Sequence, residues 1–392
     1  MLIQNKRIRD TVSKVICAVF SGINRVIPKK SKQVLFYTNT GVKDNLKAVM
    51  DCMASDPDFC SHQLICSCDD PKGVPAGIKV ISDIAGLFAF MRSGYVFYYN
   101  GKLPIKPADR QTVVNLWHGI PLKKIGRMVD PSMDLDFSTH YLAPSLYTGT
   151  LMQQAFGCDS SKILICGLPR CDRLFEAPSP QEGCRLLGYS HCSRIVAWMP
   201  TFRNAAVSNV CDSDLKQISE TGLPLLHEPA ALAVCNELLK AQNTLLWIKL
   251  HPSESEFPQR ICYSNILIQS DPEFQQLDLD YYRMLGCCEA LITDYSSVYF
   301  DFLLLDRPLG FAVEDIASYA ENRGFTADDP IGQMPGAILQ DKAELLAFLS
   351  SVLTGQYDAF AGQRKMIREL YCGDTDPHAA QTLLQKIHLK GA

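Results

Sequence analysis

The sequence of 392 residues has no run of apolar residues long enough to cross a membrane. A membrane-spanning helix needs about 20 consecutive, mostly apolar residues. The longest apolar run near the N-terminus, residues 15–20, has six. The sequence therefore excludes a protein with several membrane-spanning helices. With 47% hydrophobic and 20% charged residues, the chain is expected to form two or three globular domains.

The chain contains 16 cysteines but lacks any C-x-x-C pair. Zinc sites and thioredoxin-like redox sites usually show that spacing, so neither kind of site is expected. The N-terminus also lacks a secretory signal, because Lys14 interrupts its apolar residues and no A-x-A-like cleavage site follows. We therefore expect a cytoplasmic protein with reduced thiols.

An excess of positive charge is absent as well. There are 38 Lys and Arg against 42 Asp and Glu, a net charge of −4, which argues against general nucleic-acid binding. The charge is unevenly distributed, however. Residues 1–32 hold eight basic residues and one acidic residue, so 30 basic and 41 acidic residues remain for the rest of the chain. The basic end and the acidic body are expected to meet different surroundings.

The basic end has the pattern of a helix with one apolar face. Apolar residues at positions 12, 15, 16, 19, 23, 26 and 27 follow helical spacing, and Pro28 and three lysines come next. Such a helix suits the headgroup layer of an anionic membrane. The alternative is an ordinary first helix that packs on its own domain. The first interpretation predicts a membrane-association segment over residues 1–32.

The rest of the chain alternates between strand-like and helical patterns. Seven short apolar runs lie between residues 33 and 166, and five more lie between residues 195 and 313. A polar stretch with two prolines and two glycines, residues 176–194, separates the two series. This pattern predicts an α/β protein with two Rossmann-like domains, residues 33–185 and 186–392, that face each other across a cleft. Ligands of such sheets bind at the carboxyl ends of the strands.

Two histidines stand at such strand ends. His118 follows the run 112–117 and precedes Gly119, which permits close approach to the backbone. His251 follows the run 244–250. Imidazole titrates near neutral pH and can take a proton from an attacking hydroxyl. Either histidine could instead have a structural role, such as a hydrogen bond to backbone.

Two further patterns point to an anion. The strand-like run 290–293 continues into Asp294-Tyr295-Ser296-Ser297 and then a helical pattern, and a helix start beside two hydroxyls suits phosphate. Serine and aspartate are also ordinary helix caps. Arg170 and Arg203 follow predicted strands, and a guanidinium matches phosphate oxygens, although each could form a surface ion pair. Neither the P-loop signature nor a G-x-G-x-x-G after a strand is present.

Taken in order, five motifs resemble the CDP-glycerol glycerophosphotransferase family of teichoic-acid and related capsule synthesis. They are WHGIPLKKIG (117–126), GLPRCD (167–172), MPTFRN (199–204), IKLHP (248–252) and LITDYSSVYFDFLLLDRP (291–308). The resemblance implies a GT-B fold whose C-terminal half binds a CDP-alcohol. It also implies an enzyme at the inner face of the cell membrane that acts on a lipid-linked or glycan acceptor.

The resemblance also implies roles for single residues. His118 corresponds to the catalytic base, and His251 to the histidine that contacts the transferred phosphate. Donor-binding roles are implied for Gly119, Pro121, Arg170, Pro200, Thr201, Arg203, Lys249, Thr293, Ser296, Ser297 and Asp301. Ile120 stands where many members have threonine, so a hydroxyl contact is not expected there. No metal site and no cofactor are implied beyond the CDP-alcohol substrate.

The predicted reaction transfers glycerol phosphate, or a related polyol phosphate, to a hydroxyl of the acceptor and releases CMP. Catalysis of phosphoryl transfer rests largely on positioning and electrostatics, which fits two histidines, arginines and a helix start. Two alternatives remain at this point. One is a sugar-nucleotide glycosyltransferase or epimerase of the same architecture, and the other is a non-catalytic binding protein.

Overall fold

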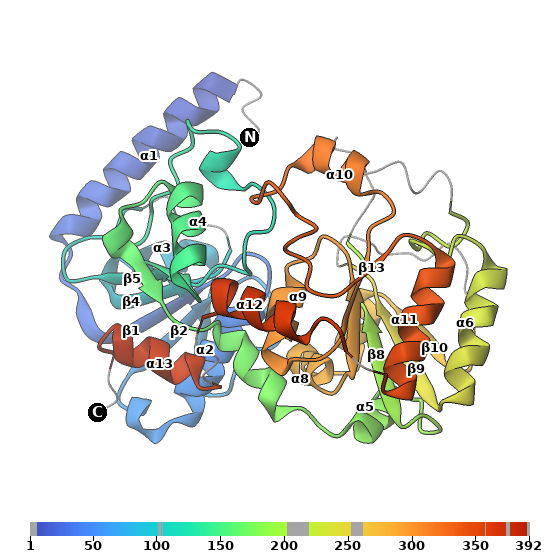
Figure 1. Cartoon of the computed structure of the whole chain (residues 1–392). Coiled ribbons are helices and arrows are strands. Elements are labelled where there is room, and N and C mark those ends of the chain that lie inside the picture. The colour runs from blue at the N-terminus through green and yellow to red at the C-terminus, as the bar shows by residue number, and fades with distance from the viewer. Residues whose placement is uncertain are drawn as a thin grey trace. The chain divides into compact units, whose positions relative to one another are not determined.

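The computed structural model in Figure 1 describes residues 6–100, 103, 105–201, 219–251, 262–356, 358–373 and 377–389. The chain divides into two compact units. Unit 1 comprises residues 1–119, 125–172 and 373–392, and unit 2 comprises residues 120–124 and 173–372.

Within its described residues, unit 1 is built on a seven-stranded parallel sheet with the order β3-β2-β1-β4-β5-β6-β7. The strands are β1 (Lys30–Tyr37), β2 (Gln63–Ser67), β3 (Lys79–Ile81), β4 (Ser93–Tyr98), β5 (Thr112–Asn115), β6 (His140–Ala143) and β7 (Ile163–Ile165). The helices of this unit are α1 (Lys6–Val26), α2 (Asp44–Ser55), α3 (Asp83–Arg92), α4 (Leu146–Phe156) and α13 (Ala379–Lys386).

The described part of unit 2 contains a six-stranded parallel sheet with the order β10-β9-β8-β11-β12-β13. The strands are β8 (Arg194–Trp198), β9 (Thr244–Lys249), β10 (Ile266–Gln269), β11 (Ala290–Thr293), β12 (Leu309–Ala312) and β13 (Ala337–Leu339). The helices are α5 (Pro180–Leu186), α6 (Pro229–Ala241), α7 (Asp271–Gln276), α8 (Tyr281–Gly286), α9 (Val298–Phe302), α10 (Ile316–Arg323), α11 (Lys342–Thr354) and α12 (Ala361–Tyr371).

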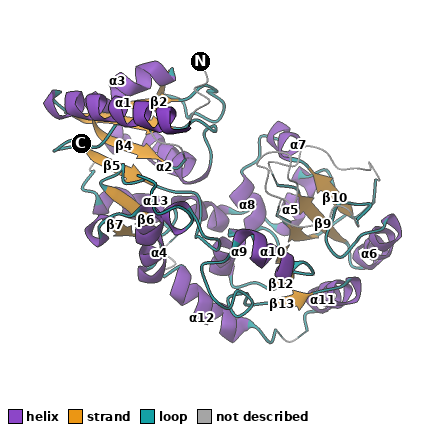
Figure 2. Cartoon of the chain, turned by 90° about the horizontal axis from the view of Figure 1, so that it is seen from above, coloured by secondary structure: helices purple, strands orange, loops and turns teal. Residues whose placement is uncertain are grey.

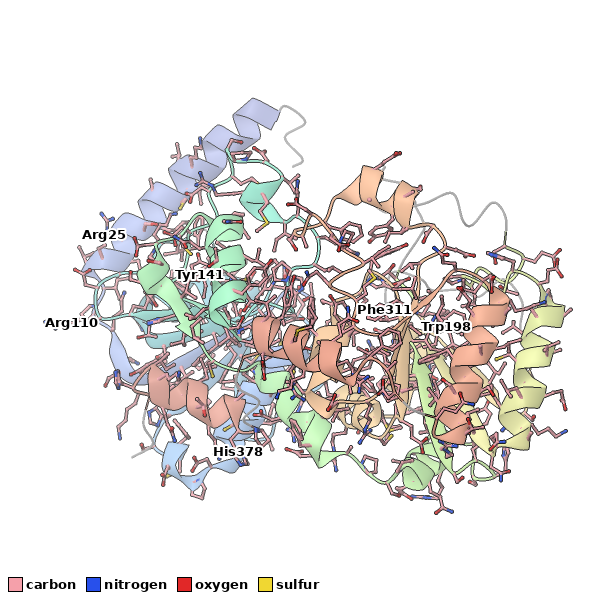
Figure 3. All side chains as sticks on the ribbon, in the orientation of Figure 1. Arg25, Arg110, Tyr141, Trp198, Phe311 and His378 are labelled. Carbon is pink, nitrogen blue, oxygen red and sulfur yellow. The ribbon has the colours of Figure 1, made fainter. Side chains whose placement is uncertain are left out.

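The central strands are short apolar runs because helices cover both faces of each parallel sheet. All six residues of β9 are buried, as are all four of β11 and of β12. Figure 3 shows Tyr141 in the interior of unit 1 and Trp198 and Phe311 in the interior of unit 2, and none of the three is exposed to solvent. Large side chains of this kind fill the space between sheet and helices.

The twelve strands predicted from the sequence are confirmed, with their ends shifted by at most three residues. The α/β class is therefore confirmed as well. The sequence did not indicate β13, whose three residues are too few for a recognisable apolar run. The stretch 176–194, predicted to be a connection, contains α5 (Figure 1), which begins with Ser179 as its cap and Pro180 as its first residue.

The two units differ in extent from the domains expected from the sequence. The division falls after residue 172 rather than after residue 185, and the C-terminal residues 373–392 belong to unit 1. Within unit 1, the carboxylate of Asp172 accepts hydrogen bonds from the backbone N–H groups of Ala379 and Ala380, at 2.8 and 2.9 Å. These bonds satisfy two otherwise unpaired donors at the start of α13 and fix the helix to this unit.

Helix α1 lies along one side of unit 1 and contacts α3 (Figures 1 and 2). Phe20 packs against the core of unit 1, and two polar residues of α1 are buried as well. Asn24 is fully buried and donates hydrogen bonds to Lys106 O and Gln111 Oε1, both at 3.0 Å, and Ser21 Oγ accepts one from Lys106 N at 2.8 Å. Between residues 14 and 26, where the side chains of α1 are described, the large apolar residues that remain exposed are Val15, Ile16, Val19, Ile23 and Val26. Among the described helices, none has the length and apolar character that a membrane span requires.

Fifteen of the cysteines lie in the described ranges, and all fifteen are free thiols. Most are buried, as expected for small apolar side chains in a core. Burial raises the pKa of the Cys184 and Cys235 thiols to about 12, so both remain protonated at neutral pH.

Gly286 at the end of α8 offers a test of the packing in unit 2. A Cβ at this position would lie 2.3 Å from the carbonyl oxygen of Leu174, so Gly286→Ala forces the backbone to move. We expect a loss of about 1–3 kcal/mol in the free energy of unfolding. Gly362 on α12 is the matched control, since a Cβ there meets no atom within 4 Å. Urea denaturation should give a lower midpoint for Gly286→Ala than for the unmodified protein, whereas the midpoint of Gly362→Ala should not fall. Equal midpoints for the two variants would contradict this packing.

Candidate active site

In unit 1, His118 lies in a tight turn after β5. Asn115 Oδ1 accepts a hydrogen bond from Trp117 N at 2.9 Å, and Trp117 adopts a left-handed backbone conformation with φ of 51°. Gly119 also has a positive φ, 144°, which explains why glycine follows the histidine. The indole ring of Trp117 lies 4.0 Å from the imidazole ring of His118 and covers one side of it, whereas the His118 side chain is exposed to solvent.

The surroundings of His118 keep its imidazole neutral at pH 7. Although part of the side chain reaches solvent, the surrounding protein partly desolvates the ring and lowers its pKa below the usual range, and the positive charges of Arg170 and Lys43 act in the same direction. The carboxylate of Asp44 opposes them. Arg170 itself is 3% exposed and forms an ion pair with Asp44, with 2.8 Å between Nη1 and Oδ1. A neutral imidazole open to solvent is in the right state to accept a proton.

In unit 2, His251 follows β9, and both lysines and aspartates act on its imidazole. Its pKa is lowered to about 4, mainly by burial and then by the charges of Lys123 and Lys249. The carboxylates of Asp294 and Asp271 raise this pKa, but by less than burial and the two lysines lower it. His251 is therefore neutral at pH 7, and the positive charge beside it favours an anionic ligand.

Both lysines near His251 are held in place. Lys249 is 6% exposed and pairs with Asp271, with 2.7 Å between Nζ and Oδ1. Lys123 Nζ lies 5.0 Å from the centre of the Tyr319 ring, a cation–π distance. The segment around Pro121 and Lys123 docks on unit 2 through Thr326, whose Oγ1 donates hydrogen bonds to Pro121 O and Leu122 O at 3.0 and 3.1 Å.

The loops after β8 and β11 are joined by buried hydrogen bonds. Thr201 N donates to both carboxylate oxygens of Asp294, each at 3.0 Å, and Asp294 is fully buried. Thr293 Oγ1 donates to Met199 O at 2.8 Å. The side chain of Thr293, predicted to bind the donor, therefore holds the neighbouring loop with its Pro200–Thr201 pair.

Ser296 and Ser297 lie half-buried just before α9. This helix has only five residues, and Ser297 makes no capping hydrogen bond with its side chain. Asp301, on α9, is 2% exposed and accepts a hydrogen bond from Tyr282 Oη at 3.1 Å. The two hydroxyls are thus accessible in part, whereas the Asp301 carboxylate is engaged inside unit 2.

The predicted residues fall into one group in each unit. His118, Gly119 and Arg170 lie in unit 1. In unit 2, Thr201, His251 and Ser296 follow β8, β9 and β11, which are neighbours in one parallel sheet, so these residues lie along its carboxyl edge. Arg203 lies outside the described residues. No cluster of three or more potential metal-ligating His, Cys, Asp or Glu side chains occurs in the described part of the chain.

Three residues near these groups were not predicted: Asp44, Asn45 and Asp294. Asp294 belongs to the Thr-Asp-x-Ser-Ser motif, so its position after a strand was a usable signal. Asp44 and Asn45 begin α2, where they look like ordinary residues of a helix start. Only the fold brings them to His118 and Arg170.

The architecture is GT-B-like. Over 98% of this chain and 95% of the other, the structure matches that of the wall teichoic acid polymerase TagF with a TM-score of 0.74 at 20% sequence identity. The UDP-bound Staphylococcus aureus protein MnaA is more distant, with a TM-score of 0.52 at 10% identity over 91% and 97% of the two chains. These similarities confirm the predicted fold class.

A sequence model of the CDP-glycerol:poly(glycerophosphate) glycerophosphotransferase family matches residues 19–389. The chain therefore belongs to this family, and the resemblance found in its motifs is confirmed. Among its relatives, the teichoic acid poly(glycerol phosphate) polymerase of Bacillus spizizenii is 25% identical over 92% of this chain and 97% of its own length. The teichoic acid glycerol-phosphate transferase of Staphylococcus aureus is 25% identical over 71% and 72%.

The charges around His251 predict a specific change in its titration. Lys123→Ala removes a positive charge that lowers the pKa of His251, so this pKa should rise from its value of about 4. Lys124→Ala is the matched control, since it removes an equal charge from the next residue. Histidine NMR titration, with the signal assigned by a His251→Gln variant, measures both. Equal shifts in the two variants would contradict the proposed environment.

Proposed function

We propose that this protein transfers glycerol phosphate from CDP-glycerol to a hydroxyl group of a lipid-linked acceptor and releases CMP. The observation that carries this proposal is the family match over residues 19–389, within which each unit presents a histidine just after a strand. The products would be glycerol-phosphate chains of a teichoic-acid or capsule-like polymer. A ribitol or other polyol donor is the closest variant of this function.

In the proposed reaction, the acceptor oxygen attacks the β-phosphorus of CDP-glycerol as His118 accepts the hydroxyl proton. The new O–P bond forms while the bond from phosphorus to the oxygen of CMP breaks, and CMP leaves with the bridging oxygen. His251 would contact the phosphoryl group that is transferred. Lys123 and Lys249 would supply positive charge where negative charge develops.

The proposed base can be tested by substitution. His118→Ala should lower kcat by about 10²–10⁴-fold, because general-base catalysis typically contributes that much. His191→Ala is the control, since His191 is exposed and its ring nitrogen is engaged with Ser264 O at 2.9 Å. CMP release from CDP-glycerol in the presence of a lipid-linked primer is the readout. A near-normal rate for His118→Ala would rule out His118 as the base.

The choice of donor separates this function from its main alternative. A sugar-nucleotide enzyme shares the GT-B-like fold, as the likeness to a UDP-bound protein illustrates. The proposed enzyme should release CMP from CDP-glycerol and no UMP or UDP from UDP-sugars. Product mass after incubation with CDP-glycerol or CDP-ribitol would identify the polyol.

The exposed apolar stripe of α1, formed by Val15, Ile16, Val19, Ile23 and Val26, supports attachment to the inner face of the cell membrane. A helix that simply packs on its own domain should bury its apolar side chains, whereas α1 buries Ser21 and Asn24 and, apart from Phe20, exposes its large apolar side chains between residues 14 and 26. Lys14, Arg25 and Lys30 are exposed around it, and Figure 3 shows Arg25 at the end of the helix. Apolar side chains bordered by basic residues match the headgroup layer of an anionic membrane.

A charge placed on this stripe should weaken membrane binding. Val19→Glu buries a carboxylate in the headgroup region and removes apolar contact worth about 1.5 kcal/mol or more, so binding should fall about tenfold or more. Val234→Glu on α6 is a matched control, since the two valines are 54% and 53% exposed. Sedimentation with vesicles of phosphatidylglycerol and phosphatidylcholine measures the effect. Equal binding by both variants would refute attachment through α1.

A further inference from the structure

The turn that presents His118 is conformationally strained. Trp117, immediately before the histidine, has a φ of 51°, in the left-handed region that an aromatic residue rarely adopts. Such a conformation costs about 1 kcal/mol or more and persists only where surrounding contacts enforce it. The position of the imidazole therefore depends on the groups that hold Leu116 and Trp117.

The side chain of Asn45 provides those contacts. Asn45 is fully buried, and its Nδ2 donates hydrogen bonds to Leu116 O at 3.1 Å and to Trp117 O at 3.0 Å. Its Oδ1 accepts a hydrogen bond from Arg170 N at 3.1 Å. A single amide group thus joins the turn after β5 to the loop after β7. No other uncharged side chain of this size offers two donors and an acceptor in this arrangement.

An ion pair also links the start of α2 to the loop after β7. Asp44 Oδ1 accepts a hydrogen bond from Asn45 N at 2.7 Å and pairs with Arg170 Nη1 at 2.8 Å. Because Arg170 is almost completely buried, this pair is little weakened by solvent. The side chain of Arg170 therefore reinforces the link that its backbone makes to Asn45.

We propose that Asn45 is a positioning residue of the transfer reaction, which fixes the strained Trp117–His118 turn and is itself held by the Asp44–Arg170 ion pair. The proposal rests on the role of His118 as the base. It also gives Arg170 a role in unit 1 that is independent of donor binding. Asn45 acts through His118 and touches neither substrate.

Loss of the Asn45 amide should impair the chemical step more than donor binding. In Asn45→Ala the carbonyls of Leu116 and Trp117 lose their donors, so the turn can relax and displace the imidazole. A displacement of about 1 Å can cost up to about 10²-fold in rate, so we expect kcat to fall about 10–100-fold. KM for CDP-glycerol should change less than about twofold, because the groups proposed to contact the transferred phosphate, His251, Lys123 and Lys249, lie in unit 2.

A matched control separates positioning from simple loss of stability. Asn236 on α6 is 8% exposed and its side chain ties this helix to the loop before β10, since its Oδ1 accepts from Asn265 N at 2.9 Å and its Nδ2 donates to Ser264 Oγ at 3.3 Å. Asn236→Ala should lower the urea midpoint as Asn45→Ala does and leave kcat unchanged. If Asn45→Ala fails to fold, Asn45→Ser, which retains a small donor, takes its place in the same comparison.

The decisive measurement is a double-mutant cycle with His118. If Asn45 acts through the imidazole, Asn45→Ala should cost less than about threefold in a His118→Ala background. A folded Asn45→Ala variant with normal kcat would overturn the positioning role. The same conclusion would follow if Asn45→Ala lowered the rate of the His118→Ala variant by the same factor as that of the unmodified protein. A near-normal rate of His118→Ala alone would rule out His118 as the base, whereas an unmodified protein that releases no CMP from CDP-glycerol would overturn the proposed function, so these failures are distinguishable.

The pH profile gives a second readout that a purely structural residue would not alter. The charged groups that act on His118 are Asp44, Arg170 and Lys43. Asp44→Asn removes the negative charge that favours the imidazolium, so the acidic limb of the kcat/KM profile should move to lower pH. A limb that stays in place, or moves to higher pH, would contradict the described arrangement around His118.

Discussion

The burial of parallel strands on both faces determines where chemistry can occur in this protein. Strands such as β9 and β11 are buried along their whole length, and their polar side chains stand only at the strand ends, as Lys249 and Thr293 do. Reactive groups likewise gather where the strands end. His118 follows β5 in unit 1, and Thr201, His251 and Ser296 follow three adjacent strands of unit 2. The polar residues of the candidate site are thus a consequence of the sheets that carry them.

Several of these residues have partners within the fold. Thr293 and Asp294 join the loops after β8 and β11, Asp301 binds a tyrosine hydroxyl, and Arg170 pairs with Asp44. The proposed reaction uses the two histidines, together with Lys123 and Lys249 beside His251. The imidazoles share one property, since both have pKa values lowered chiefly by burial and are neutral at pH 7. In the proposed function, one accepts a proton and the other contacts a phosphate.

Local sequence patterns predicted the parts of the structure that local forces determine. Twelve apolar runs were identified as strands, and the helical spacing over residues 12–27 corresponds to most of α1. Features that depend on tertiary contacts could not be read in this way. The burial of Asn24 in α1, the return of α13 to unit 1 through Asp172, and the link from Asn45 to Trp117 all join residues far apart in sequence. A single sequence carries no signal for such pairs, because each residue alone looks like an ordinary cap or surface group.

The most direct test of the central claim compares single and double variants of the two histidines. CMP release from CDP-glycerol in the presence of a lipid-linked primer should be strongly reduced in His118→Ala and in His251→Ala. If both imidazoles serve one transfer step, the double variant should be scarcely slower than the slower single variant, because groups that act as a unit are not additive. Near-normal CMP release by either single variant, with the protein folded, would contradict the account.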